Sequence, residues 1–149
     1  MREQKEDMET RQSPEESPRK LLLTSLIPIR WGDMDAYGHV NNTIYFRYME
    51  QARCEWLEAL GYKVAPEGEA PVIINASCTF LVPITYPGTV EVRLFAGRLG
   101  RSSVDTHYEL RLAGSDLLYS EGAAKIVWMN VATGRSVPIP DALRAVVSQ

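Results

Sequence analysis

The sequence predicts a single α+β domain with an antiparallel sheet, and three observations support this prediction. One long helical pattern, at residues 43–61, comes early in the chain. Consecutive strand patterns follow it, separated by Gly- and Pro-containing turns. A helix followed by strands on tight turns is typical of α+β proteins with antiparallel sheets. The length of 149 residues and the hydrophobic content of 45% fit one domain with a substantial core.

The strands are predicted from apolar runs and from period-two alternation of apolar and polar side chains. Pro28 suits an edge or the end of the first strand, because proline cannot donate to a ladder. In chain order, the expected strands are residues 21–30, 72–82, 90–96, 104–112 and 117–131, and a short helix is expected at 138–147.

Apolar residues at three- and four-residue spacing predict the buried face of the helix at 43–61. This stripe consists of Tyr45, Tyr48, Met49, Ala52, Trp56, Ala59 and Leu60. Other apolar residues lie outside the stripe, so the helix is apolar over more than half of its circumference. We therefore expect a helix that is mostly covered, with Gly61 as its C-terminal stop.

The composition excludes several classes of protein. The net charge of −3 gives no reason to expect nucleic acid as a partner. The chain has no apolar run of membrane-spanning length and no signal-peptide pattern, so we expect no membrane association and a cytoplasmic location. Cys54 and Cys78 are too few and too far apart for a disulfide framework or a metal site.

Residues 1–20 differ from the rest of the chain. Eleven of these twenty residues are charged, and the only large apolar side chains are two methionines. Such a segment cannot bury enough apolar surface to offset its ordering entropy. We expect a disordered tail at 1–20 and a folded domain at 21–149, although a helix that docks on a partner would also fit the tail.

A loop before the long helix holds the candidate chemistry. Asp33, Asp35 and His39 lie just upstream of Asn41 and Asn42, which are both good N-cap residues. The free amides and the positive dipole of a helix start attract an oxyanion. A carboxylate beside such an amide is an arrangement that acyl transfer uses.

The run GDMDAYGHVNNTIYFRYMEQAR, residues 32–53, resembles the opening motif of the 4-hydroxybenzoyl-CoA thioesterase family. This family is a branch of the hotdog-fold acyl-CoA thioesterases, and plant acyl-carrier-protein thioesterases look similar at the Asp and His-Val-Asn-Asn positions. The resemblance implies a hotdog fold, in which the sheet wraps around one long helix. It also implies an acyl-CoA substrate, no metal or organic cofactor, and a homodimer or homotetramer with active sites at subunit interfaces.

The resemblance also implies roles for residues of the loop. Asp35 matches the catalytic carboxylate, which attacks the thioester carbonyl or activates water. Asn42 matches the residue whose backbone amide polarises that carbonyl. His39 matches a catalytic His of the plant enzymes, but Tyr37 stands where their pattern has Asn. A turn-forming Asp35 and a structural His39 are the alternatives, and Asp33 is expected to shape the loop, paired with Arg30 or Arg53.

Two helix residues complete the candidate site. Glu50 lies eight residues after Asn42, near the offset of a catalytic Glu in another hotdog branch; its alternative is an ion pair with Arg47 or Arg53. Tyr45 matches a tyrosine of the family and lines the pocket or packs in the core.

Coenzyme A requires cations for its phosphates. Arg98, Arg101 and Lys125 are the candidates, since each falls in an expected turn or strand end. Two other classes remain open. One is a non-enzymatic acyl-CoA-binding hotdog module, and the other is a hotdog hydratase or dehydratase, whose Asp and His sit in a different motif.

Overall fold

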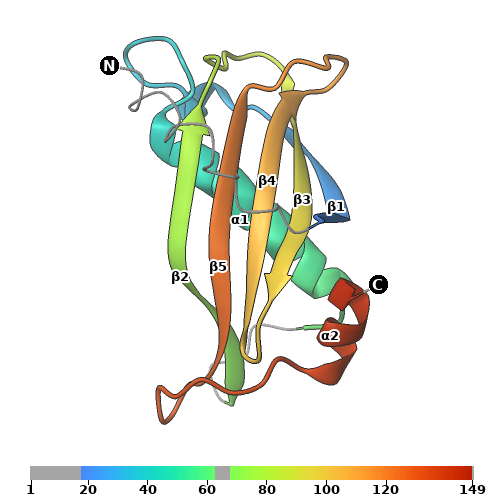
Figure 1. Ribbon diagram of the computed structural model, residues 1–149. Coiled ribbons are helices and arrows are strands. Elements are labelled where there is room, and N and C mark those ends of the chain that lie inside the picture. Colours follow the sequence, from blue (N-terminus) through green and yellow to red (C-terminus); the bar gives the residue numbers. More distant parts are fainter. Residues whose placement is uncertain (1–17, 63–67, 149) are drawn as a thin grey trace, which may run out of the picture.

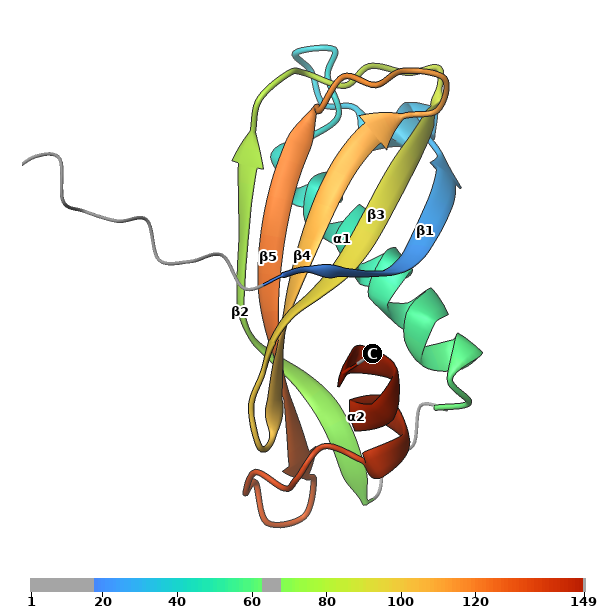
Figure 2. The ribbon, with the colours of Figure 1, turned by 45° about the vertical axis from the view of Figure 1, so that its right-hand side comes forward.

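The protein is described from a computed structural model, which covers residues 18–62 and 68–148. Five antiparallel strands form one sheet in the order β1-β3-β4-β5-β2. Figure 1 shows the long helix α1 lying across one face of this sheet, and Figure 2 shows the sheet curving around it. The elements are β1 (Lys20–Pro28), α1 (Asn42–Ala59), β2 (Glu69–Phe80), β3 (Thr89–Leu99), β4 (Ser103–Leu112), β5 (Ser120–Asn130) and α2 (Asp141–Ser148).

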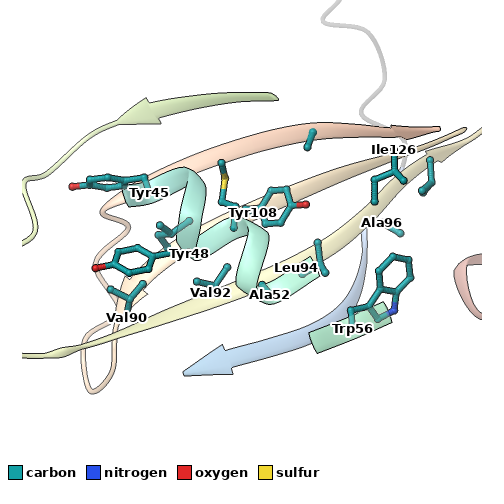
Figure 3. Packing of buried hydrophobic residues seen from close by; sticks show 14 of the residues in the cluster. Tyr45, Tyr48, Ala52, Trp56, Val90, Val92, Leu94, Ala96, Tyr108 and Ile126 are labelled. Atoms are coloured by element: carbon teal, nitrogen blue, oxygen red, sulfur yellow. The ribbon is translucent and has the colours of Figure 1, made fainter. Parts of the chain in front are cut away.

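The core lies between α1 and the concave face of the sheet. Five of the predicted stripe residues of α1 are buried: Tyr45, Tyr48, Met49, Ala52 and Trp56. Figure 3 shows these helix side chains against the buried side chains of β3, which alternate as the period-two pattern predicts. The predicted α+β hotdog architecture is therefore confirmed.

Glycine at one position of β5 lets α1 approach the sheet. A Cβ atom added at Gly122 would collide with the sulfur of Met49, a fully buried residue of α1, and would lie 3.0 Å from the carbonyl oxygen of Ser77. The absence of a side chain at Gly122 therefore allows α1 to pack this closely against β5.

The helix is covered on one side only. Ala59 and Cys54 are exposed, and Phe46 keeps 36% of its surface in solvent. The expectation of a mostly covered helix is therefore wrong for the single chain, because the sheet faces only one side of α1. The outer edge strand β2 also exposes apolar side chains, namely Val72, Ile73 and Ile74.

Every expected element is present, with bounds that differ by up to three residues at an end. The last strand begins at Ser120 instead of residue 117, since the residues before it form a turn in which Ser115 bonds back to Leu112 and the Arg111 side chain bonds the Asp116 carbonyl. The first strand ends at Pro28, and a 3₁₀ turn, Trp31–Asp33, follows it.

The expected tail at 1–20 falls mostly outside the described residues. Lys20 already belongs to β1, and its ammonium donates to the carbonyl of Val146 in α2. Within residues 18–62 and 68–148, no helix has the length and apolarity that a membrane span requires.

Candidate functional site

The loop between β1 and α1 is closed at its base. Met34 and Val40 form an isolated antiparallel bridge, and the Asp35 amide donates to the His39 carbonyl at 3.0 Å. Gly38 adopts φ 79°, a left-handed conformation that glycine accepts without strain. Asp35 to His39 therefore form a compact turn at the end of the sheet.

Asp33 anchors this loop to the helix. Its carboxylate is buried and accepts from the Tyr48 hydroxyl at 2.8 Å and from the Arg30 amide at 3.0 Å. The Arg30 guanidinium lies 3.8 Å away, so the expected pairing with Arg30 is confirmed. Burial, and then the bond to Asp33, raise the pKa of Tyr48 well above its usual range. The Asp33 carbonyl also accepts from the Asn41 amide at 2.9 Å, which fixes the loop just before the helix.

Asp35 is half-buried, and each of its oxygens accepts one hydrogen bond. Oδ1 accepts from the Tyr37 amide at 2.9 Å, and Oδ2 accepts from the Asn41 side-chain Nδ2 at 3.1 Å. The Asn41 oxygen meanwhile caps α1, accepting from the Thr43 amide at 2.9 Å. The Asn41 side chain thus joins the candidate carboxylate directly to the helix start.

Asn42, His39 and Tyr45 line one cavity. It has a volume of about 270 Å³, and the chain at residues 80–83 forms its other side. Asn42 is the first residue of α1, where an amide has no acceptor within the helix. Asp35 does not line this cavity. Its carboxylate lies beside the helix start through its bond to Asn41, the neighbour of Asn42.

Tyr45 both packs in the core and lines this cavity. Its ring meets the Phe80 ring edge to face at a centroid distance of 4.8 Å. Burial raises the pKa of Tyr45, and a backbone hydrogen bond at Ile84 partly opposes that rise. Tyr45 is therefore neutral at ordinary pH and limits the depth of the cavity.

Glu50 lies on the open flank of α1 and pairs with Arg47 at 3.4 Å. Just over half of the Glu50 side chain is exposed. It borders two grooves, one of about 690 Å³ between β1 and α1 and one of about 290 Å³ between α1 and β2. The structure thus contains the expected ion pair and places Glu50 outside the cavity at the helix start.

The predicted coenzyme A cations lie far from the loop within one chain. Arg98 is near the end of β3, and Arg101 is in the hairpin to β4, at the end of the sheet opposite the β1–α1 loop (Figure 1). The Arg101 carbonyl accepts from the Ile139 amide and from the Arg144 side chain. Lys125 is exposed on β5. The single chain does not bring these cations to Asp35.

Sequence reasoning treated Asn41 only as an N-cap and did not foresee its bond to Asp35. The spacing of six residues between the two gave no signal for this contact, because the contact depends on the turn at Gly38. Sequence reasoning also did not place Arg53 in the groove between α1 and β2, because a cation at this helix position looks like an ordinary surface residue.

Comparisons with known proteins show the family of this chain. A family model described as the thioesterase-like superfamily matches residues 29–147. The PA2801 protein from Pseudomonas aeruginosa is 47% identical with a TM-score of 0.84, over 86% of this chain and 99% of its own. XC229 from Xanthomonas campestris, described as "a putative acyl-CoA thioesterase", is 35% identical with a TM-score of 0.69, over 73% of this chain and 93% of its own.

A plant relative matches at the sequence level. The chloroplastic acyl-acyl carrier protein thioesterase ATL3 of Arabidopsis thaliana is 30% identical over 125 residues, which is 80% of this chain. The chain spans 64% of the length of ATL3 and 65% of a second relative, from Aquifex aeolicus.

Proposed function

Because this chain belongs to the thioesterase-like superfamily, we propose that it is an acyl-CoA thioesterase with Asp35 as its catalytic carboxylate. The family and the relatives support thioester hydrolysis. The acyl-CoA substrate and the residue roles are our proposal, supported by the motif at residues 32–53 and by the described activity of XC229. The reaction consumes one water, breaks the carbonyl carbon–sulfur bond, and releases a free acid and the thiol of coenzyme A.

The arrangement of Asp35 and the helix start carries this proposal. Thioester hydrolysis needs a group that delivers a nucleophile and a donor that stabilises the developing oxyanion. The Asn42 amide, at the positive end of α1, is the proposed donor. Asp35 is the proposed acid residue, and the Asn41 side chain holds it to the same helix end at 3.1 Å.

Two routes are compatible with this arrangement. In one, Asp35 attacks the carbonyl, the thiolate leaves, and water hydrolyses the resulting mixed anhydride. In the other, Asp35 takes a proton from water as the water attacks. His39 lines the cavity at the helix start together with Asn42. We propose that it orients the thioester and does not act as a base.

Release of free thiol from a panel of acyl-CoA thioesters, and from the same acyl groups on acyl carrier protein, tests the proposal. We expect turnover of the coenzyme A thioesters that exceeds the activity on carrier-protein thioesters. Turnover of the carrier-protein thioesters alone would make this chain an acyl-acyl carrier protein thioesterase, as ATL3 is named. Binding without thiol release would support the acyl-CoA-binding module instead.

We also propose that the enzyme acts as a homodimer or homotetramer in the cytoplasm. The exposed apolar edge of β2 and the uncovered flank of α1 support assembly. The free thiols of Cys54 and Cys78 support a reducing compartment.

A further inference from the structure

A chain of hydrogen bonds fixes the side chain of Arg53 against the core. The buried Thr106 hydroxyl donates its single hydrogen to the Ala124 carbonyl at 2.9 Å. Tyr108 must therefore donate its own hydrogen to Thr106, at 2.8 Å. The Tyr108 oxygen is then free to accept from Arg53 Nη1 at 3.2 Å. The donor and the acceptor of each hydrogen bond in this series are therefore fixed, and the series ends at the Arg53 guanidinium.

Arg53 has no carboxylate partner among the described residues. The sequence offered Glu50 as a partner, but Glu50 pairs with Arg47. Within residues 18–62 and 68–148, the hydrogen bond to Tyr108 is the only one that the Arg53 side chain makes, and its Cζ lies 5.7 Å from the centroid of the Tyr108 ring. A guanidinium has five N–H donors, so four of them remain for another group.

Arg53 borders the groove between α1 and β2, which has a volume of about 290 Å³. Thr43, Phe46, Arg47, Glu50, Arg53 and Ala76 line it. Ala76 on β2 is the register partner of Ala124 on β5, the residue whose carbonyl accepts from Thr106, so the groove lies beside the strands that anchor Arg53. With two cations and one carboxylate, the groove carries a net positive charge.

The groove begins one residue after the proposed oxyanion donor and reaches Arg53. Thr43 follows Asn42 directly, and the lining positions from 43 to 53 recur at three- and four-residue spacing along one flank of α1. Ten residues correspond to about 15 Å of helix, and a helical side chain leans back toward the N-terminus. An acyl chain whose carbonyl sits at the helix start can therefore place its far end near the guanidinium.

We propose that Arg53 binds a carboxylate at the far end of the acyl group, so that the enzyme prefers dicarboxylic acyl-CoA thioesters of medium length. The fork of an arginine matches a carboxylate with two parallel hydrogen bonds, and such charge-assisted bonds are among the stronger ones in proteins. This inference rests on the proposed function. Its test must therefore have a readout that does not need turnover.

The test compares sebacoyl-CoA with decanoyl-CoA, which have the same ten-carbon chain and differ in the terminal carboxylate. We expect kcat/KM for sebacoyl-CoA to exceed that for decanoyl-CoA by about 10-fold or more, as charge-assisted bonds allow. Arg53→Met should abolish this preference by lowering kcat/KM for sebacoyl-CoA. Arg53→Lys should keep part of it, since it retains the charge without the fork.

Arg93→Met is the matched control, because Arg93 is a half-buried cation that pairs with Glu91 on β3. It should leave the preference intact. Dissociation constants of both thioesters, measured by calorimetry in an Asp35→Asn background with and without Arg53→Met, provide the second readout. If no thioester is hydrolysed, the proposed function fails, while the ratio of dissociation constants still tests Arg53.

Two results would overturn the inference. One is an equal kcat/KM and equal affinity for sebacoyl-CoA and decanoyl-CoA in the unmodified protein. The other is an Arg53→Met variant that loses the same affinity for both thioesters, which would make Arg53 a contact of the coenzyme A phosphates.

Discussion

The Asn41 side chain donates to Asp35 Oδ2 at 3.1 Å while its own oxygen caps α1 through the Thr43 amide. One side chain therefore links the loop carboxylate to the helix end that stabilises the oxyanion in the proposed reaction. Any shift of Asn41 moves Asp35 relative to that helix end, so we assign Asn41 a positioning role.

Replacing Asn41 with Ser should separate the positioning role from the cap. Serine is a good N-cap, but its short hydroxyl cannot also donate to Asp35. We expect kcat to fall by about 10- to 100-fold, the scale that a misplaced reacting group costs, with KM nearly unchanged. Unfolding in urea should show a loss of only a few tenths of a kcal/mol. Thr43→Ala keeps the bond between Asn41 and Asp35 and serves as the control, and a Ser variant with normal kcat would refute the positioning role.

The two candidate acids can be separated by amide substitutions. Asp35→Asn should lower kcat by at least about 100-fold, the lower end for removing a positioned acid or base. Glu50→Gln should cost much less, because an exposed ion pair with Arg47 contributes only about 0.3–0.5 kcal/mol. Both variants should be checked by circular dichroism, so that unfolding is not mistaken for lost chemistry. A folded but inactive Glu50→Gln beside an active Asp35→Asn would move the chemistry onto the helix.

Alkaline unfolding should report the burial of Tyr48 and its bond to Asp33. Because the pKa of Tyr48 is raised in the folded state, its contribution to stability is complete below the unfolded pKa of about 10 and is lost as pH rises above it. The free energy of unfolding, measured in urea, should therefore fall as the pH rises above about 10. Tyr48→Phe should lower stability at pH 7 and make this fall shallower. An unchanged slope in Tyr48→Phe would mean that other groups govern the alkaline loss.

Gly122→Ala should destabilise the fold by about 1–3 kcal/mol, the usual cost of overpacking a core. The added methyl group would collide with Met49 and approach the Ser77 carbonyl. Gly32→Ala is the control, since its methyl group would meet no atom within 4 Å. Denaturant midpoints of the unmodified protein and the two variants check this expectation. Equal midpoints for Gly122→Ala and Gly32→Ala would contradict the close approach of α1 to β5.

Assembly should depend on the exposed edge of β2. Val72 keeps 38% of its surface in solvent on the edge strand and lies in regular register outside the bulge at Ile74, which is a position suited to strand pairing between copies. Light scattering should give at least a dimer, and Val72→Lys should shift it toward monomer. Leu117→Lys, on an exposed apolar residue in the irregular segment before β5, is the control. A monomer in the unmodified protein would refute the expected interface.

The parts of the fold that follow local patterns were predictable from the sequence. Helical spacing identified the buried face of α1 through Tyr48 and Trp56, and alternation identified β3 and β4. The start of β5 was missed because Leu117 and Leu118 are apolar but lie in an irregular segment, and β5 begins only where Ser120 pairs with Leu110. Pairing across strands is not encoded in the local hydrophobic pattern.

The candidate site was predictable in its residue types but not in its contacts. The motif pointed to Asp35 and Asn42, and the structure places both near the helix start. The contacts of Asn41 and Arg53 were not predictable, because each side chain bonds a residue that only the tertiary fold brings near. Arg53 meets Tyr108 from β4, 55 residues away in the chain.

The bridge between Met34 and Val40 makes the loop of Asp35 an interchangeable module. Its two ends are tied to the domain, because Asp33 bonds Tyr48 and the Val40 amide donates to the Ile84 carbonyl at 2.8 Å. The Tyr37 side chain between these ends is 90% exposed, and only its amide serves Asp35. Side chains at the tip can therefore be exchanged while the carboxylate stays in place, so this stretch tolerates substitution directly beside the proposed reacting group.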